Sequence, residues 1–177
     1  MGQFIILDAQ ESNTIDNIKP ALLVIDVQKV YFKRMDQSDV DKPIEVINTA
    51  VELFNDQNLP VIYIYHRNNT SEKHQFIDEI VVPENATKVL KQYGNAFTKT
   101  ELNDILKELN CNTLFLCGLS ATACVKATYQ GGDELEYETY LIKNGSMSPS
   151  EKKTRMIEEK FETVDLDSVK ELISKVQ

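Results

Sequence analysis

Short apolar runs alternate with amphipathic stretches along the chain. Residues 21–27 and 61–65 are almost continuously apolar, which is typical of strands covered on both faces. Between them, residues 43–54 repeat apolar side chains with helical spacing, beginning at a proline that suits a first helical turn. Further strands are expected at residues 87–91, 114–117, 137–143 and 161–164, and further helices at 102–109, 122–131, 148–160 and 167–176. This order predicts βαβ units in an α/β fold, a Rossmann-like three-layer α/β/α domain with a mostly parallel sheet of about six strands.

Local signals predict where several helices begin and end. Residues 98–101 (TKTE) and 148–151 (SPSE) have the spacing of a capping box, and the second also has a proline suited to a first helical turn. The glycine pair at residues 131–132 predicts the end of the helix that opens near residue 122. Residues 67–83 are polar and are expected to form a long loop with one helical turn, as binding loops often do.

The size and charge of the chain limit its architecture and its partners. At 177 residues, it is expected to form one domain at residues 20–177 after an N-terminal arm at residues 1–19. The net charge of −9 argues against nucleic acid and against anionic membrane surfaces as partners. No apolar run reaches the roughly 18 residues of a membrane span. The N-terminus does not resemble a secretory signal and the three cysteines fit no zinc-ligand spacing, so free thiols in the cytoplasm are expected.

One stretch, TLFLCGLSATACV (residues 113–125), is predicted to carry a strand through a tight turn into a helix that holds Cys124 in its first turn. The unpaired N–H groups and the positive dipole end of such a turn favour a thiolate and can receive an oxyanion. This geometry is typical of an acyl-transfer nucleophile, so Cys124 is expected to be the most reactive thiol. The alternative is that Cys124 is a buried core residue, as cysteines in apolar helices often are.

Charged residues end two of the other predicted strands. Asp26 lies at the end of the strand at residues 21–27, where a buried carboxylate needs a partner or a task, and Lys91 ends the strand at residues 87–91. Because ligands bind at the carboxyl ends of parallel strands, Asp26, Lys91 and Cys124 are expected to gather at one edge of the sheet. The alternatives are that Asp26 caps a strand or forms a structural ion pair, and that Lys91 is an ordinary solvated lysine.

Three motifs, in order, resemble those of the isochorismatase-like cysteine hydrolases, the superfamily of nicotinamidases and N-carbamoylsarcosine amidases: VIDVQKVYF (residues 24–32), KQYGNAFTKTEL (91–102) and CGLSATACV (117–125). The resemblance spans residues 20–164. It implies that Asp26 is a general base, Lys91 its electrostatic partner and Cys124 the nucleophile. It also implies a peptide bond between Leu119 and Ser120 that is often cis, and an oxyanion hole made of the backbone N–H groups of Ser120 and Cys124.

The same resemblance bears on the pocket, the cofactors and the reaction. The candidates for the substrate pocket are Gln28, Phe32, His66, Tyr93, Phe97 and Leu119. The aspartate that nicotinamidases carry beside the second strand is missing near His66, and His74 does not replace it, so neither a metal nor another cofactor is expected. The related siderophore-pathway isochorismatases lack the cysteine. A retained Cys124 therefore indicates a small amide-type (C–N) substrate that is hydrolysed through a thioester.

Two alternatives to an amidase remain. One is a vinyl-ether hydrolase of the isochorismatase type, which needs no thiol nucleophile. The other is a catalytically silent binding scaffold, because Ala121 and Thr122 stand where Thr and Asp are usual in the family, and Asn144 replaces a common Asp. The resemblance further implies that the protein forms a homo-oligomer. The expected binding partner is a small-molecule substrate.

Overall fold

The computed structural model describes residues 17–33, 35–36, 39–66, 71–80 and 82–176, so most of the expected N-terminal arm lies outside the described residues. Its six-stranded sheet has the order β3-β2-β1-β4-β5-β6, and all neighbouring strands are parallel. The strands are β1 (Pro20–Ile25), β2 (Val61–His66), β3 (Thr87–Lys91), β4 (Thr113–Leu119), β5 (Glu138–Met147) and β6 (Thr163–Val164). The predicted α/β fold and strand number are confirmed.

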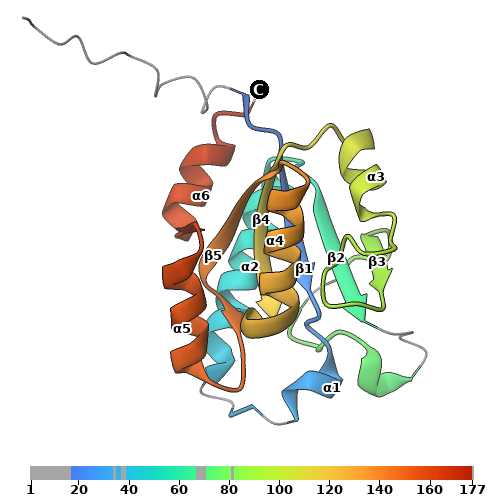
Figure 1. Cartoon of the computed structure of the whole chain (residues 1–177), viewed down its shortest axis with the longest axis vertical. Coiled ribbons are helices and arrows are strands. Elements are labelled where there is room, and N and C mark those ends of the chain that lie inside the picture. The colour runs from blue at the N-terminus through green and yellow to red at the C-terminus, as the bar shows by residue number, and fades with distance from the viewer. Residues whose placement is uncertain (1–16, 34, 37–38, 67–70, 81, 177) are drawn as a thin grey trace, which may run out of the picture.

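Helices cover both faces of the sheet, as Figure 1 shows with α4 in front of the strands and α2 behind them. The helices α2 (Asp41–Asp56) and α6 (Leu166–Ile173) pack on one face, and α3 (Leu102–Glu108), α4 (Lys126–Glu134) and α5 (Glu151–Lys160) pack on the other. Every residue of β1 is buried because the strand lies between these two layers, which explains its continuously apolar sequence. Within the described part of the chain, no helix combines the length and the apolar character needed to cross a membrane.

The sheet has a topological switch point between β1 and β4. These strands are neighbours in space, but the chain continues from β1 to β2 on one side and from β4 to β5 on the other. In such sheets, ligands bind outside the carboxyl ends of the strands at the switch point. Two short elements, α1 (Lys29–Phe32) and the 3₁₀ turn η3 (Glu72–His74), follow β1 and β2 and lie beyond this edge.

The two central strands approach closely where Ile25 pairs with Gly118. Gly118 has a φ of +115°, and a Cβ atom on it would lie 2.1 Å from the carbonyl oxygen of Ile25. Glycine is required there because other residues rarely adopt this backbone conformation and have no space for a side chain. The close approach places the residue after β1, Asp26, beside the turn that follows β4.

The capping box predicted at residues 98–101 is not formed. Helix α3 begins at Leu102 without a side-chain cap. The hydroxyl of Thr100 instead donates to the carbonyl of Ala96 and accepts the N–H of Leu102 at 3.3 Å. The prediction is wrong because residues 96–100 form a turn of their own, in which the backbone N–H of Thr98 donates to the carbonyl of Asn95 at 3.2 Å instead of to the side chain of Glu101.

The N-cap of helix α5 lies two residues later than predicted. Its N-cap is Ser150, whose hydroxyl accepts the N–H of Lys153 at 3.4 Å. The hydroxyl of Ser148, the predicted cap, lies 2.8 Å from that of Thr154. The sequence offers two serines around the proline, and the contact with Thr154 decides between them.

Helix α4 continues to Glu134, past the glycine pair where it was predicted to end. Packing explains the pair better than termination does. A Cβ atom on Gly131 would lie 2.3 Å from the side chain of Asn95, and one on Gly132 would lie 2.6 Å from that of Thr139. Asn95 is distant in sequence and Thr139 lies on the following strand, so the helical pattern itself could not reveal this role.

We predict that Gly118→Ala lowers the free energy of unfolding by about 3 kcal/mol or more, because the substitution combines a strained backbone with a steric clash. Urea unfolding followed by circular dichroism measures the change. The matched control is Gly94→Ala, whose Cβ would meet that of Ala127 at an ordinary 3.7 Å, and which should change stability by less than about 1 kcal/mol. Equal stability of the two variants would contradict the close approach of β1 and β4.

Candidate active site

A buried ion pair lies at the carboxyl edge of the sheet. Lys91 is the last residue of β3 and Asp26 follows β1, and their Nζ and Oδ2 atoms are 2.6 Å apart. Their side chains are 0% and 2% exposed, respectively. The Lys91 ammonium also donates to the carbonyl of Tyr93 at 3.3 Å. The second carboxylate oxygen, Asp26 Oδ1, is buried without a well-aligned hydrogen bond among the described residues.

Cys124 lies on a π-helical turn, η4 (Ala121–Val125), which joins β4 to α4. The turn is closed by the N–H of Val125, which donates to the carbonyl of Ser120 at 3.1 Å. The peptide bond between Leu119 and Ser120 is cis, as the family resemblance implied. The sequence predicted an ordinary first helical turn at this place. Single π turns are rare in proteins, but where they occur they often lie at functional sites.

The thiol of Cys124 interacts with both members of the ion pair. Burial raises the pKa of Asp26 above its usual value, and the Lys91 ammonium and the Cys124 thiol oppose this increase. Burial also raises the pKa of Cys124, and the Asp26 carboxylate raises it further, while Lys91 lowers it. The expectation of a lowered thiol pKa is therefore wrong, because the positive groups do not outweigh burial and the carboxylate. The resting thiol keeps its proton beside a group that can accept it.

The other two cysteines have different surroundings. Cys117 is completely buried in β4, where its thiol donates to the carbonyl of Leu23 at 3.6 Å, and burial raises its pKa well above the usual range. Cys111 follows α3 and is partly exposed, and burial raises its pKa to about 11. Of the three thiols, Cys124 is the one in contact with a carboxylate and an ammonium.

Gln28 was predicted to contact the substrate, but it is a buried brace. Its side-chain nitrogen donates to the carbonyls of His66 and His74, and its oxygen accepts the N–H of His66 at 2.8 Å. The residue is 0% exposed, so its amide ties the end of β2 to η3 rather than facing a ligand. The ring of His66 lies between the Tyr31 hydroxyl, 3.1 Å from Nδ1, and the Gln92 carbonyl, 3.2 Å from Nε2.

Helix α1 contributes one residue that the sequence did not single out. Tyr31 reaches across from α1 to the ring of His66 at the end of β2. Tyr31 lies within the motif at residues 24–32, but helical periodicity cannot be recognised over a single turn, so the direction of its side chain could not be predicted. Phe32, a predicted pocket residue on the same helix, lines a hollow of about 280 Å³ between α1, the start of α2 and residues 77–79.

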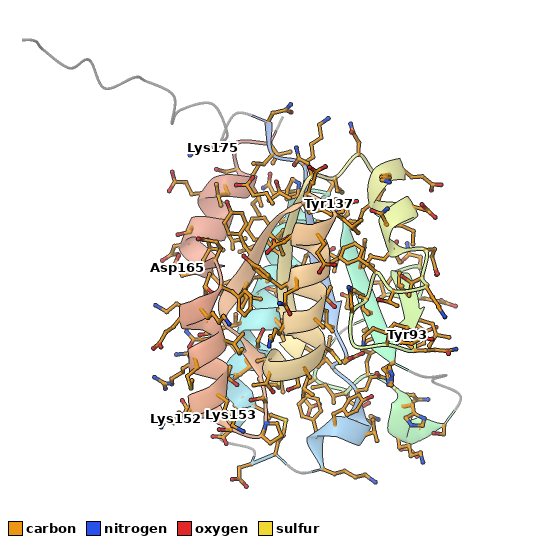
Figure 2. The ribbon with its side chains drawn as sticks, in the orientation of Figure 1. Tyr93, Tyr137, Lys152, Lys153, Asp165 and Lys175 are labelled. Carbon is orange, nitrogen blue, oxygen red and sulfur yellow. The ribbon has the colours of Figure 1, made fainter. Side chains whose placement is uncertain are left out.

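The remaining pocket candidates lie in three different settings. Tyr93 is 45% exposed, with its hydroxyl 3.4 Å from Lys99 Nζ, and Leu119 is buried at the end of β4. Phe97 stacks on Tyr137 with ring centroids 5.8 Å apart. Tyr137 precedes β5 and so lies toward the amino ends of the strands, and Figure 2 shows it nearer the opposite end of the sheet from Tyr93. Phe97 therefore packs against a residue near the amino end of β5, and its place in the pocket stays a prediction.

The residues around His66 do not fit a metal site. Both ring nitrogens of His66 lie within hydrogen-bonding distance of protein groups, and Nδ1 of His74 lies 3.1 Å from the Ser71 hydroxyl. Across the described ranges, no group of three or more His, Cys, Asp or Glu side chains is arranged to hold a metal ion. The chemistry available at the site is that of a thiol, a carboxylate and an ammonium.

Iodoacetamide at neutral pH is predicted to alkylate Cys124 before the other two thiols, with the order read by peptide mass spectrometry. Lys91→Ala should slow this reaction, because the cation that lowers the pKa of the thiol is lost. Asp26→Asn should accelerate it, because the carboxylate that raises the same pKa is removed. Faster labelling of Cys111 or Cys117 in the folded protein, or acceleration by Lys91→Ala, would contradict the arrangement of charges.

Comparison with known proteins identifies a family. The family model described as "Isochorismatase domain" matches residues 20–164. The isochorismatase family protein YrdC of Bacillus subtilis (strain 168) is 31% identical over 140 residues, which cover 72% of this chain and 73% of YrdC.

Solved structures share the fold. A cysteine hydrolase from Pseudomonas syringae pv. phaseolicola 1448A is 17% identical and covers 90% of this chain and 94% of its own, with a TM-score of 0.78. The N-carbamoylsarcosine amidase from Thermoplasma acidophilum is 21% identical and covers 84% of this chain and 95% of its own, with a TM-score of 0.73. Since the family match spans every strand of the parallel sheet and all three residues at its carboxyl edge, this chain belongs to the isochorismatase-like hydrolase family.

Proposed function

We propose that this protein hydrolyses a small amide-type substrate by cleaving a C–N bond through a thioester on Cys124. The observation that carries the proposal is the buried Asp26–Lys91 ion pair in contact with the Cys124 thiol at the switch point of the sheet. A carboxylate held beside a protonated thiol is arranged for general-base activation of a nucleophile. The names of two structural relatives, a cysteine hydrolase and N-carbamoylsarcosine amidase, agree with this chemistry.

In the first step, Asp26 accepts the thiol proton while the Cys124 sulfur attacks the carbonyl carbon of the substrate. The raised pKa of Asp26 supports this role, because it brings the proton affinity of the carboxylate closer to that of the thiolate. Lys91 is completely buried, so its ammonium acts through Asp26 and Cys124 rather than by touching the substrate. Its charge keeps the site near neutral as negative charge develops on sulfur and oxygen.

The backbone N–H groups of Ser120 and Cys124 are the proposed oxyanion hole. Support comes from the position of Ser120 at the N-cap of η4, where its carbonyl is already held by the N–H groups of Ala123 and Val125. That anchoring fixes the direction of the turn that carries the sulfur. An oxyanion donor of this kind contributes about 10²- to 10³-fold to kcat.

In the second step, the proton on Asp26 passes to the nitrogen of the leaving amine, and the C–N bond breaks. The acyl group stays on the Cys124 sulfur as a thioester. Asp26 then takes a proton from water as the water oxygen attacks the thioester carbonyl. The S–C bond breaks, the proton returns to the sulfur, and a carboxylic acid leaves. The first half-reaction returns Asp26 to its carboxylate form, and the second returns a proton to the Cys124 sulfur, so the full cycle restores the starting protonation of the site.

We predict that Cys124→Ala lowers kcat for small amides by about 10³-fold or more, because the covalent route is lost. Asp26→Asn should lower it by roughly 10²- to 10⁴-fold, because the general base is lost. Release of ammonia or amine from a panel of small amides measures turnover. In the wild-type protein, intact-mass spectrometry should show an added acyl group that is absent in Cys124→Ala.

Two outcomes would replace this proposal by another function. If Cys124→Ala keeps wild-type activity on a vinyl ether, the protein is a vinyl-ether hydrolase without a covalent intermediate. If no small amide acylates Cys124 although iodoacetamide does, the protein is a binding scaffold with a reactive but idle thiol.

Hydrolysis is also predicted to be independent of metal ions, because both ring nitrogens of His66 lie within hydrogen-bonding distance of protein groups, and among the described residues no group of three or more His, Cys, Asp or Glu side chains could hold a metal ion. Exhaustive treatment with EDTA and 1,10-phenanthroline, followed by the amide assay in metal-free buffer, should leave activity unchanged. Activity that is lost on chelation and restored by Zn²⁺, Mn²⁺ or Fe²⁺ would show that a metal is required.

A further inference from the structure

One face of helix α4 supports the loop that follows the buried lysine. This post-lysine loop (residues 92–100) runs from β3 to α3 (Figure 1). It rests on Ala127, Thr128 and Gly131, which follow Cys124 by three, four and seven residues. Cys124 lies on η4, which runs directly into α4, so the sulfur and the surface that receives the loop lie on consecutive turns of one continuous helical segment.

Three contacts join the loop to this face of α4. The backbone N–H of Ala96 donates to the hydroxyl of Thr128 at 3.0 Å, and both residues are 0% exposed. The side chain of Asn95 lies against Gly131, where a Cβ atom would come within 2.3 Å of it. Gly94 lies above Ala127, where an added Cβ would be 3.7 Å away. The bond to Thr128 is a directional contact, because a buried N–H that loses its acceptor must move to find another.

The loop in turn holds the ammonium of Lys91. The carbonyl of Tyr93 accepts a hydrogen bond from Lys91 Nζ at 3.3 Å, on the same nitrogen that pairs with Asp26. A shift of the loop would therefore move one of the oxygen atoms that fix this charge. The path from helix to lysine is short, because Ala96 and Tyr93 are three residues apart.

We propose that Thr128 is a positioning residue, whose hydroxyl sets the Lys91 ammonium relative to the Cys124 thiol through the post-lysine loop. The proposal rests on the proposed function, in which Lys91 stabilises the negative charge that develops on the sulfur. Thr128 lies only four residues, about 6 Å along a helix, from Cys124. A fixed hydrogen bond from that helix to the loop keeps the cation and the nucleophile in register when a substrate enters.

The test uses the full-length protein and the pH dependence of Cys124 alkylation by iodoacetamide, read by peptide mass spectrometry. Thr128→Val keeps the shape of the side chain but removes the acceptor. It should slow alkylation at neutral pH by about threefold or more and move the profile to higher pH, as Lys91→Ala does. Thr128→Ser keeps the hydroxyl and should restore the wild-type profile. The matched control is Thr139→Val, a buried threonine at the amino end of β5, which should leave the profile unchanged.

A double variant separates positioning from general destabilisation. If Thr128 acts through Lys91, Thr128→Val should add little to the effect of Lys91→Ala in the double variant. Fully additive effects, a wild-type profile for Thr128→Val, or an equal shift for Thr139→Val would overturn the proposal. Should Thr128→Val fail to fold, Gly131→Ala displaces Asn95 from the same face and should slow alkylation, and a wild-type profile for that variant would overturn the proposal equally.

The lysine variant tells the two proposals apart. If Lys91→Ala slows alkylation while Thr128→Val does not, the positioning role of Thr128 fails and the proposed function stands. If Lys91→Ala leaves the reaction of Cys124 unchanged, the electrostatic role of Lys91 in the proposed function fails, and the role of Thr128 fails with it.

Discussion

The ion pair between Asp26 and Lys91 is the interaction on which the rest of the site depends. Both side chains are almost completely buried, so each charge is tolerated only because the other lies 2.6 Å away. Removing one member of such a pair typically costs about 3–5 kcal/mol, because it leaves an uncompensated buried charge. The pair joins the ends of β1 and β3 across β2, and its position at the switch point gives these two charges a neighbour, the thiol of Cys124.

The backbone brings that thiol to the pair by two local departures from regular structure. Gly118 lets β1 and β4 approach more closely than any side chain would permit, so Asp26 lies beside the turn after β4. The π turn η4 then carries Cys124 before the chain settles into α4. Packing holds both departures in place. The central strands around Gly118 are buried, and α4, which continues from η4, packs against the post-lysine loop.

Burial has a larger effect on the protonation of Cys124 than the positive groups nearby. A helix start and an ammonium favour a thiolate, but burial and the Asp26 carboxylate raise the pKa of Cys124. In the proposed mechanism, the proton stays on the Cys124 sulfur at rest, and the Asp26 carboxylate removes it when the sulfur attacks a substrate. Reactivity then depends on how well Lys91 is placed, since it is the cation that favours the thiolate.

The sequence by itself determined the α/β class, the six strands and the meeting of Asp26, Lys91 and Cys124 at one edge, because apolar runs mark buried strands and parallel strands share their carboxyl ends. Only the tertiary structure decided which serine caps α5, why α4 passes its glycines, and where Phe97 lies, because each depends on a contact with a side chain from another turn, strand or loop. The brace at Gln28 and the link from Tyr31 to His66 are of the same kind, formed between segments that no local pattern connects. The protonation state of Cys124 also belongs to the tertiary structure, since burial and a carboxylate from another strand set it.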